Sequence, residues 1–392
     1  MIEMSNHCVR CAVLMLFPAL FLFACSSSGG GTGGTGIVSR GAISEFGSIV
    51  VNGRRFDTNG AAVVVKNKVI GVGDAAVVEN LDIGKVVTVI GTGREGDESA
   101  TGDRVVYRSN VKGPLAAIQN SGKETLSVQI LGQRIMVNTL TRIKSTTFEA
   151  LETGDSVEVS GYFDHSGTIW ATFLEKVMSD AVVEVAGRIH DLNDGSKTCQ
   201  INQLTVDYAS ADTGGLPRGM PAEGLMVEVE GMLDESGTIL VATKIDVDDV
   251  LDGEDQGQLE VTGFVTGITS IYEFVVGSQK IRVEAGAVVV DGDLDDIGLG
   301  VKLEAEGKLS AGVLYAHEIE FWEPDQMEIE GLVEEMISAA SFKIDSRIVT
   351  THPDTVYEGG TVAEIAVGVN LEIKGRLEGG VLQADKVSFE PE

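Results

Sequence analysis

The chain has 392 residues with 60 acidic and 29 basic side chains, giving a formal net charge of −31. Hydrophobic residues make up 43% of it, which argues against disorder along the whole chain. The negative charge argues against a nucleic-acid binder, and the 5% aromatic content argues against a stacking platform for single strands. No catalytic constellation stands out, so we expect a protein that is not an enzyme.

Residues 1–24 are predicted to form a signal peptide. Residues 11–24 read CAVLMLFPALFLFA, an uncharged apolar run of 14 that is too short to span a bilayer. The run ends at Ala24 followed by Cys25, which resembles the lipobox of bacterial lipoproteins. The resemblance implies that Cys25 is lipidated and becomes the mature N-terminus. The alternative is an ordinary signal peptide beside a chance cysteine.

Residues 25–40 are predicted to tether a folded body to this anchor. Ser26 to Gly36 reads SSSGGGTGGTG, a composition typical of flexible linkers. Ser26 rather than aspartate follows the cysteine, and by resemblance to lipoprotein sorting this favours the outer membrane, facing the periplasm or the cell surface. Beyond the tether only Cys199 remains, so we expect no intramolecular disulfide.

One sequence unit recurs five times along the rest of the chain. Its clearest element begins and ends in glycine, with an aliphatic residue third after the first glycine, at residues 84–91, 154–161, 224–231, 300–307 and 368–375. An earlier glycine marks each unit start, which places the units at residues 41–112, 113–186, 187–262, 263–330 and 331–392. The third unit ends in an acidic linker, residues 246–258. Four units also carry a closing element with an alanine, namely Ala171, Ala242, Ala316 and Ala384.

Local patterns predict an all-β fold. Apolar and polar residues alternate within the units, as expected for half-buried antiparallel strands. Asn52-Gly53 follows Ile49-Val-Val and precedes Arg-Arg-Phe56, and the Asn-Gly pair predicts a type I′ hairpin turn. We expect about five short strands in each unit, arranged as a small antiparallel OB-like barrel or an open sandwich. Only residues 148–151 suggest a helical turn.

The opening of unit one carries a recognisable pattern: Gly41-Ala-Ile43, Phe46-Gly-Ser-Ile-Val-Val-Asn-Gly53 and Phe56. With the recurring glycine element, it resembles the bacterial lipoprotein family known as domain of unknown function 5666. The resemblance covers residues 37–392 and is strongest in units one and two. It implies tandem copies behind a lipoprotein signal and a tether. It implies no activity, so no functional residue is transferred from it.

Two motifs have the outline of a ligand site without its full pattern. Gly91-Thr-Gly93-Arg-Glu-Gly96 matches a dinucleotide fingerprint, but no helical pattern follows it, so we interpret it as structural. Residues 291–296 begin like a calcium loop, yet Asp296 and Lys302 stand where glycine and glutamate are required. The acidic run 246–255 is interpreted as a solvated linker. Weak divalent-cation binding at these carboxylates is the most we expect, with no dedicated cofactor or metal site.

The remaining chemically reactive side chains have structural interpretations. Cys199 falls at the first apolar residue of its hairpin, which predicts a buried, inert thiol. Nothing polar other than turn residues is expected to recur at a fixed unit position. The histidines of the body differ in position from unit to unit, and the two tryptophans fall where packing is the default role: His165, His190, His317, His352, Trp170 and Trp322.

These features favour a lipid-anchored repeat protein of the cell envelope that acts as a binding or structural module. Its partners would be the membrane, through Cys25, and an envelope protein or glycan. One alternative is a cation-dependent surface adhesin or matrix protein that uses the acidic distal units. Another is an envelope hydrolase with a site between units. Charge is uneven, because unit one has nine basic and nine acidic residues whereas units three to five sum to −28.

Overall fold

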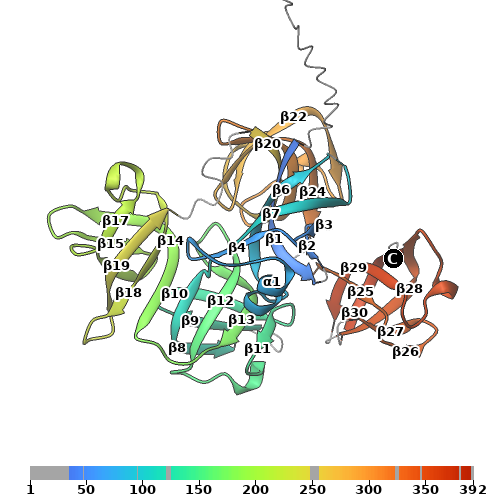
Figure 1. The fold of residues 1–392 in the computed structure, drawn as a ribbon, viewed down its shortest axis with the longest axis horizontal. Coiled ribbons are helices and arrows are strands. Elements are labelled where there is room, and N and C mark those ends of the chain that lie inside the picture. Colours follow the sequence, from blue (N-terminus) through green and yellow to red (C-terminus); the bar gives the residue numbers. More distant parts are fainter. Residues whose placement is uncertain are drawn as a thin grey trace, which may run out of the picture. The chain divides into compact units, whose positions relative to one another are not determined.

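A computed structural model of the chain describes residues 35–389 except 47, 95, 121–124, 248–255, 323–325, 345–346 and 379–380 (Figure 1). The predicted signal peptide, Cys25, most of the tether and most of the acidic linker lie outside the described residues. Among the residues that are described, no helix is both long and apolar enough to cross a membrane.

The described chain is almost entirely β-structure, and the strands repeat in a constant order. Unit one contains β1 (Thr35–Glu45), β2 (Ile49–Val51), β3 (Arg54–Asp57), β4 (Ala62–Val65), β5 (Lys68–Val72), α1 (Asp74–Asn80), β6 (Val86–Gly93) and β7 (Ser99–Tyr107). Unit two contains β8 (Val111–Asn120), β9 (Thr125–Ile130), β10 (Gln133–Asn138), β11 (Arg142–Lys144), the 3-10 helix η1 (Phe148–Ala150), β12 (Ser156–Phe163) and β13 (Ile169–Lys176).

The other three units follow the same plan. Unit three contains β14 (Val182–Asn193), β15 (Thr198–Ile201), β16 (Leu204–Asp207), β17 (Asp212–Gly215), η2 (Pro217–Gly219), β18 (Met226–Leu233) and β19 (Ile239–Val247). Unit four contains β20 (Gln256–Ser270), β21 (Glu273–Val276), β22 (Gln279–Val290), η3 (Leu294–Asp296), β23 (Lys302–Ser310) and β24 (Val313–Trp322). Unit five contains β25 (Gln326–Leu332), β26 (Glu335–Ser338), β27 (Ser341–Ile344), β28 (Arg347–Glu358), η4 (Val362–Glu364), β29 (Asn370–Glu378) and β30 (Val381–Phe389).

Each unit closes into an OB-like barrel. Five strands form each barrel and are numbered along the chain without the short strands β4, β5, β11 and β17. In unit two they are β8, β9, β10, β12 and β13, and the pairings run β8–β9–β10–β13–β12 and back to β8. The corresponding pairings recur in the other units, and in unit five β25 and β26 together take the place of the first strand. The third and fifth strands of each barrel pair in parallel. The expectation that the units are purely antiparallel is therefore wrong. A parallel pair needs a crossover connection, and the segment holding the short helix and the fourth strand supplies it.

The second strand supplies an equivalent core position in every barrel. These residues are Ile49, Val128, Cys199, Phe274 and Phe342, none more than 3% exposed. Strand pairing also joins barrels, because β1 lies parallel to β20 and β8 lies antiparallel to β14. Units one and four therefore share one sheet, and units two and three share another.

The paired glycines of the repeat have two different physical roles. The first has a backbone φ between 78° and 97° in all five units, a conformation that disfavours side chains: Gly84, Gly154, Gly224, Gly300 and Gly368. The second lies at a bulge between the fourth and fifth strands, where an added Cβ would lie 2.0–2.2 Å from a carbonyl oxygen: Gly91, Gly161, Gly231, Gly307 and Gly375.

Several element boundaries differ from the sequence expectation. Strand β1 begins at Thr35, so residues 35–40 belong to a sheet rather than to the tether. The predicted linker is similarly shortened, because β19 continues to Val247 and β20 begins at Gln256. The start glycines lie inside the first strands rather than at their beginnings. Unit one also contains α1 and the β4–β5 hairpin, which its sequence pattern did not indicate.

Candidate ligand-binding groove

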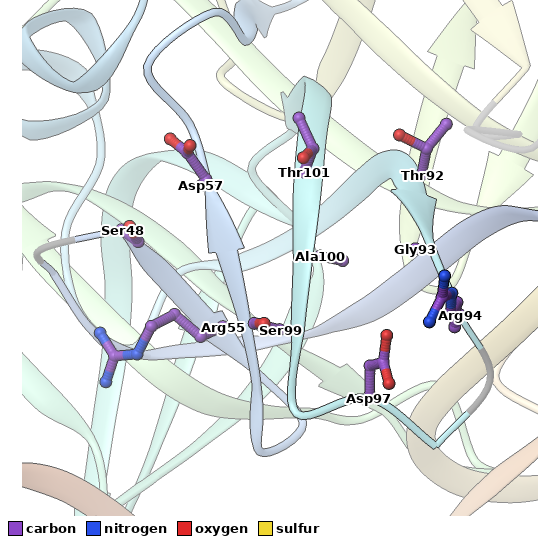
Figure 2. Close-up of a pocket in the computed structure, with 10 residues that line it drawn as sticks. All are labelled: Ser48, Arg55, Asp57, Thr92, Gly93, Arg94, Asp97, Ser99, Ala100 and Thr101. Atoms are coloured by element: carbon purple, nitrogen blue, oxygen red, sulfur yellow. The ribbon is translucent and has the colours of Figure 1, made fainter. Parts of the chain in front are cut away.

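A groove of about 430 Å³ lies on the barrel of unit one (Figure 2). It is lined by Ser48, Arg55, Asp57, Thr92, Gly93, Arg94, Asp97, Ser99, Ala100 and Thr101. Ser48 comes from the connection between the first two strands. The other lining residues come from β3, from the end of β6 with the loop that follows it, and from the start of β7. Figure 2 shows Arg55 and Asp57 on one side and Arg94 and Asp97 on the other.

Small residues form the floor of this groove. Strands β3 and β7 pair over only three residue pairs, with Phe56 opposite Ala100. An added Cβ on Gly93 would lie 2.7 Å from Cδ1 of Ile37 and 3.0 Å from Cβ of Ala100. Glycine at position 93 therefore lets β6 approach β7 closely at the point where the two strands separate into their loop.

A buried arginine holds the loop between β6 and β7. The Arg54 side chain, only 8% exposed, donates from Nη1 to the carbonyl oxygen of Asp97 at 2.8 Å and to that of Arg94 at 3.4 Å. Its Nε lies 3.7 Å from Glu260 Oε2, and its Nη2 lies 3.4 Å from Glu306 Oε1. The guanidinium is thus held on both sides, and it fixes the carbonyl groups of Arg94 and Asp97 against unit four.

Hydrogen bonds also fix the charged side chains on the β3 side. Asp57 Oδ1 accepts from the backbone N–H of Asn59 at 3.0 Å and from its Nδ2 at 2.8 Å. Arg55 pairs with Glu45 at 2.7 Å and with Glu330. Burial acts to lower the pKa of Arg55, but its hydrogen bond to Glu45 and the charge of Glu330 raise that pKa on balance.

The groove presents balanced polar chemistry. Its lining holds two arginines, two aspartates and four hydroxyl groups that can both donate and accept hydrogen bonds, and the Arg55 guanidinium is already paired with Glu45 and Glu330. Such a surface can bind an uncharged, hydroxyl-rich ligand through many directional contacts. Sequence reasoning missed the site because its residues come from four segments and share no motif. The one sequence feature noted at this place is the glycine motif of residues 91–96, which begins at the end of β6. It was interpreted as structural.

Cys199 and the calcium-like residues 291–296 both have structural roles. Cys199 is buried, as predicted, and burial raises the pKa of its thiol to about 11. The calcium-like sequence forms a capping box on η3, in which Asp293 and Asp296 each accept a backbone N–H. Asp291 pairs with Lys374 at 2.8 Å. No group of three or more potential metal ligands occurs among the residues that the structure describes.

The histidines and tryptophans do not gather at one place in the described structure. His190 bonds to the carbonyl of Asn202 at 3.0 Å, and His352 bonds to Gln383 at 2.6 Å. Trp170 donates to Asp164 at 3.1 Å. Trp322 packs under the Lys302 ammonium, which lies 4.7 Å from the ring centroid.

One polar position does recur, contrary to the sequence expectation. In units two to five, the fourth strand carries a glutamate between two apolar residues of the glycine-bounded element: Glu158, Glu228, Glu304 and Glu372. Glu158 lies 3.5 Å from Lys85 of unit one and accepts from the Tyr107 hydroxyl at 2.7 Å. Glu228 lies 3.5 Å from Arg108. In units two and three this residue therefore contacts a neighbouring barrel.

The fold thus defines a tandem array of OB-like barrels. The family model described as "Domain of unknown function (DUF5666)" matches residues 112–175, 186–246, 262–320 and 330–388, which is more than half of the chain. The protein belongs to this family. The resemblance was expected to be strongest in units one and two. Unit two is matched, whereas unit one lies outside the match, which begins at residue 112. The α1 helix and the β4–β5 hairpin are the structural departures of that unit.

Other comparisons add little. A solved structure described as "drosophila Unr CSD456" is 12% identical and is covered over 99% of its length, against 55% of this chain. Its TM-score of 0.14 is too low to support any structural argument. No curated protein matches the chain.

Proposed function

We propose that this protein is a lipid-anchored binding module of the cell envelope that holds a neutral glycan in the groove of unit one. The observation that carries the proposal is the position of the groove. OB folds bind oligonucleotides and oligosaccharides on the face formed by strands two and three and by the loops that join strands one and two and strands four and five. The groove of unit one is built from those loops, together with β3 and β7. The fold alone suggests these two polymers as ligands.

Charge decides between these two polymers. A nucleic-acid backbone carries one negative charge per phosphate, and it would meet Asp57 and Asp97 in the groove of a chain with a net charge of −31. A neutral oligosaccharide meets no such repulsion. Its hydroxyls can donate to the two carboxylates and accept from Arg94, which makes the hydrogen bonds charge-assisted.

The anchor in this proposal rests on residues 11–25, where the apolar run ends at Ala24-Cys25. Lipidation at Cys25 would attach the protein to the outer membrane, and the barrels would be displayed beyond the tether. Cell fractionation checks this: the wild-type protein should sediment with membranes, and Cys25→Ala should not. A wild-type protein in the soluble fraction would refute the anchor while leaving the groove open to test.

The groove itself is tested by glycan binding with the full-length protein. A microarray of neutral envelope oligosaccharides identifies the best-binding probe, and titration calorimetry then gives its affinity. We expect the double variant Asp57→Asn/Asp97→Asn to bind at least about 10-fold more weakly, because two charge-assisted hydrogen bonds become neutral ones. Asp103→Asn, an exposed change on β7 outside the groove, is the matched control and should bind normally. No glycan binding, or equal loss in the control, would refute the proposal.

A further inference from the structure

A chain of side-chain hydrogen bonds joins unit one to unit four beside the parallel pairing of β1 with β20. It starts at Asn52, in the turn between β2 and β3, and runs through the Thr262 hydroxyl on β20 to the Glu304 carboxyl on β23. Thr262 Oγ1 lies 3.0 Å from Asn52 Oδ1 and 2.8 Å from Glu304 Oε2. Thr262 and Glu304 are directly opposite each other in the β20–β23 pairing, so the sheet itself brings these two groups together.

The surroundings of the Asn52 amide fix its orientation. Its Nδ2 donates to the carbonyl oxygen of Arg40 and to the Ser39 hydroxyl, both at 3.2 Å. A flipped amide would place Oδ1 against the Arg40 carbonyl, which can only accept hydrogen bonds. Gly41 leaves the space that this side chain fills, because an added Cβ there would lie 1.8 Å from Oδ1. The group that Asn52 presents to Thr262 is therefore an acceptor.

Counting hydrogens then places a proton on Glu304. The Thr262 hydroxyl has a single hydrogen and Asn52 Oδ1 has none, so the contact between these two oxygens uses the hydroxyl hydrogen. The contact between Thr262 and Glu304 needs a second hydrogen, which only the carboxyl can supply. With an ionised Glu304 the hydroxyl would have to donate to the carboxylate, and two oxygens with no hydrogen between them would lie 3.0 Å apart.

The electrostatic surroundings also favour the neutral acid. Burial raises the pKa of Glu304 well above its usual value, the charges of Glu260 and Glu320 raise it further, and the Thr262 hydrogen bond opposes the shift. The charged or titratable groups on the strands around this carboxyl are Arg40, Arg54, Tyr162, Glu260, Lys302, Glu306, Glu320, Glu328, Glu372 and Lys374.

The basic members of this group are engaged elsewhere. Arg54 lies within ion-pair distance of Glu260 and Glu306, and Lys374 pairs with Glu320. Lys302 packs over the Trp322 ring, 4.7 Å from its centroid. Within the described part of the chain no cation forms an ion pair with Glu304. An ionised Glu304 would thus be a buried carboxylate without a countercharge, which is costly.

We infer that Glu304 is protonated in the folded protein at neutral pH and donates to Thr262, which makes this contact between units one and four sensitive to alkaline pH. Loss of the proton leaves one hydroxyl hydrogen for two acceptors, Asn52 Oδ1 and the Glu304 carboxylate. The side-chain link is then broken, while the backbone pairing of β1 with β20 remains. This inference is independent of the glycan groove.

The sign of the pH effect follows from the direction of the shift. The folded state binds this proton more tightly than the unfolded chain does. The stability that the proton contributes is therefore fully present below the unfolded pKa and is lost as pH rises through the raised folded pKa.

Difference infrared spectroscopy of the full-length protein in detergent solution tests the protonation state directly. At pH 7 the wild-type spectrum minus that of Glu304→Gln should contain the C=O stretch of a protonated carboxylic acid. The matched control is Glu284→Gln, at an exposed glutamate on β22 of the same barrel, whose difference spectrum should contain carboxylate bands only. Carboxylate bands alone in the Glu304→Gln difference would overturn the proposal.

Urea unfolding between pH 6 and pH 10 tests the consequence for the contact. In Glu304→Gln an amide N–H takes the place of the acid O–H and does not titrate, so its urea midpoint should fall less with rising pH than those of the wild type and Glu284→Gln. An equal fall in Glu304→Gln would refute the pH-sensitive contact.

A second variant keeps the test open if Glu304→Gln does not fold. Thr262→Val retains the carboxyl but removes the oxygen that accepts its hydrogen bond, so the C=O stretch of the protonated acid should change in frequency relative to the wild type. An unchanged band in Thr262→Val would show that Glu304 does not donate to Thr262, and the proposal would be wrong.

Discussion

At the scale of single residues, the second glycine of each repeat fixes how the fourth and fifth strands meet. At Gly161 an added Cβ would lie 2.1 Å from the carbonyl oxygen of Trp170, and the facing residue is Ala171. A side chain here cannot move away, because the clash is with backbone. The small alanine of the closing element belongs to the same feature, since it faces this glycine in four units.

We therefore expect Gly161→Ala to destabilise unit two by about 2 kcal/mol or more, the cost of overpacking in a tightly packed region. Gly60→Ala is the matched control, because an added Cβ there has nothing within 4 Å. Its stability should be unchanged or slightly higher. Urea unfolding followed by circular dichroism measures both. Equal stability of the two variants would contradict the role given to Gly161.

Sequence could locate these glycines but could not separate their roles. In the sequence both are simply glycines at the ends of a repeated element. The positive φ of Gly154 and the close approach of the Trp170 carbonyl oxygen to Gly161 are visible only in the structure. The recurring glutamate was visible in the same motif, at Glu158 and its three counterparts. Its role could not be recognised from the motif, because its partners Lys85 and Tyr107 are far away in sequence.

At the scale of elements, a buried carboxylate links the unit-four strand β20 to unit one. Glu260 is 6% exposed and accepts a hydrogen bond from the Ser39 hydroxyl at 3.0 Å. Burial raises the pKa of Glu260 to about 7, with Arg54 opposing the shift and the charge of Glu306 adding to it. In the unfolded chain a glutamate has a pKa of about 4.3.

This shift predicts stability that falls as pH rises. The folded state binds the proton more tightly, so the contribution is fully present below the unfolded pKa and is lost as pH rises through about 7. We expect the wild type to lose on the order of 1–3 kcal/mol between pH 5 and pH 8 from this group. Glu260→Gln should show a smaller loss, while Glu235→Gln, at an exposed loop residue, should behave like wild type. Denaturant unfolding at both pH values measures this, and an equal loss in Glu260→Gln would refute it.

Local pattern predicted the short-range elements well. The Asn52-Gly53 turn has positive φ at both residues, as a type I′ turn requires, and residues 148–150 form the expected helical turn. The parallel pairing of third and fifth strands could not be read locally, because it joins segments separated by the whole fourth strand. Helix α1 was missed because seven residues hold too little periodicity to be recognised.

At the scale of the whole molecule, unit one differs from the rest of the chain. It has balanced charge, lies outside the family match, and carries both the groove and the extra strand β5. The charge difference was evident from composition. The groove was not, because β3, the connection before β2 and the loop between β6 and β7 meet only when the barrel closes. We infer that the four acidic units act as a repeated scaffold and that the glycan binds to unit one.

Hydrogen exchange of the full-length protein, with and without the best-binding neutral glycan, tests this assignment most directly. We expect slower exchange confined to residues 48–57 and 92–101, with units two to five unchanged. Slower exchange in an acidic unit, with none at the groove of unit one, would contradict it.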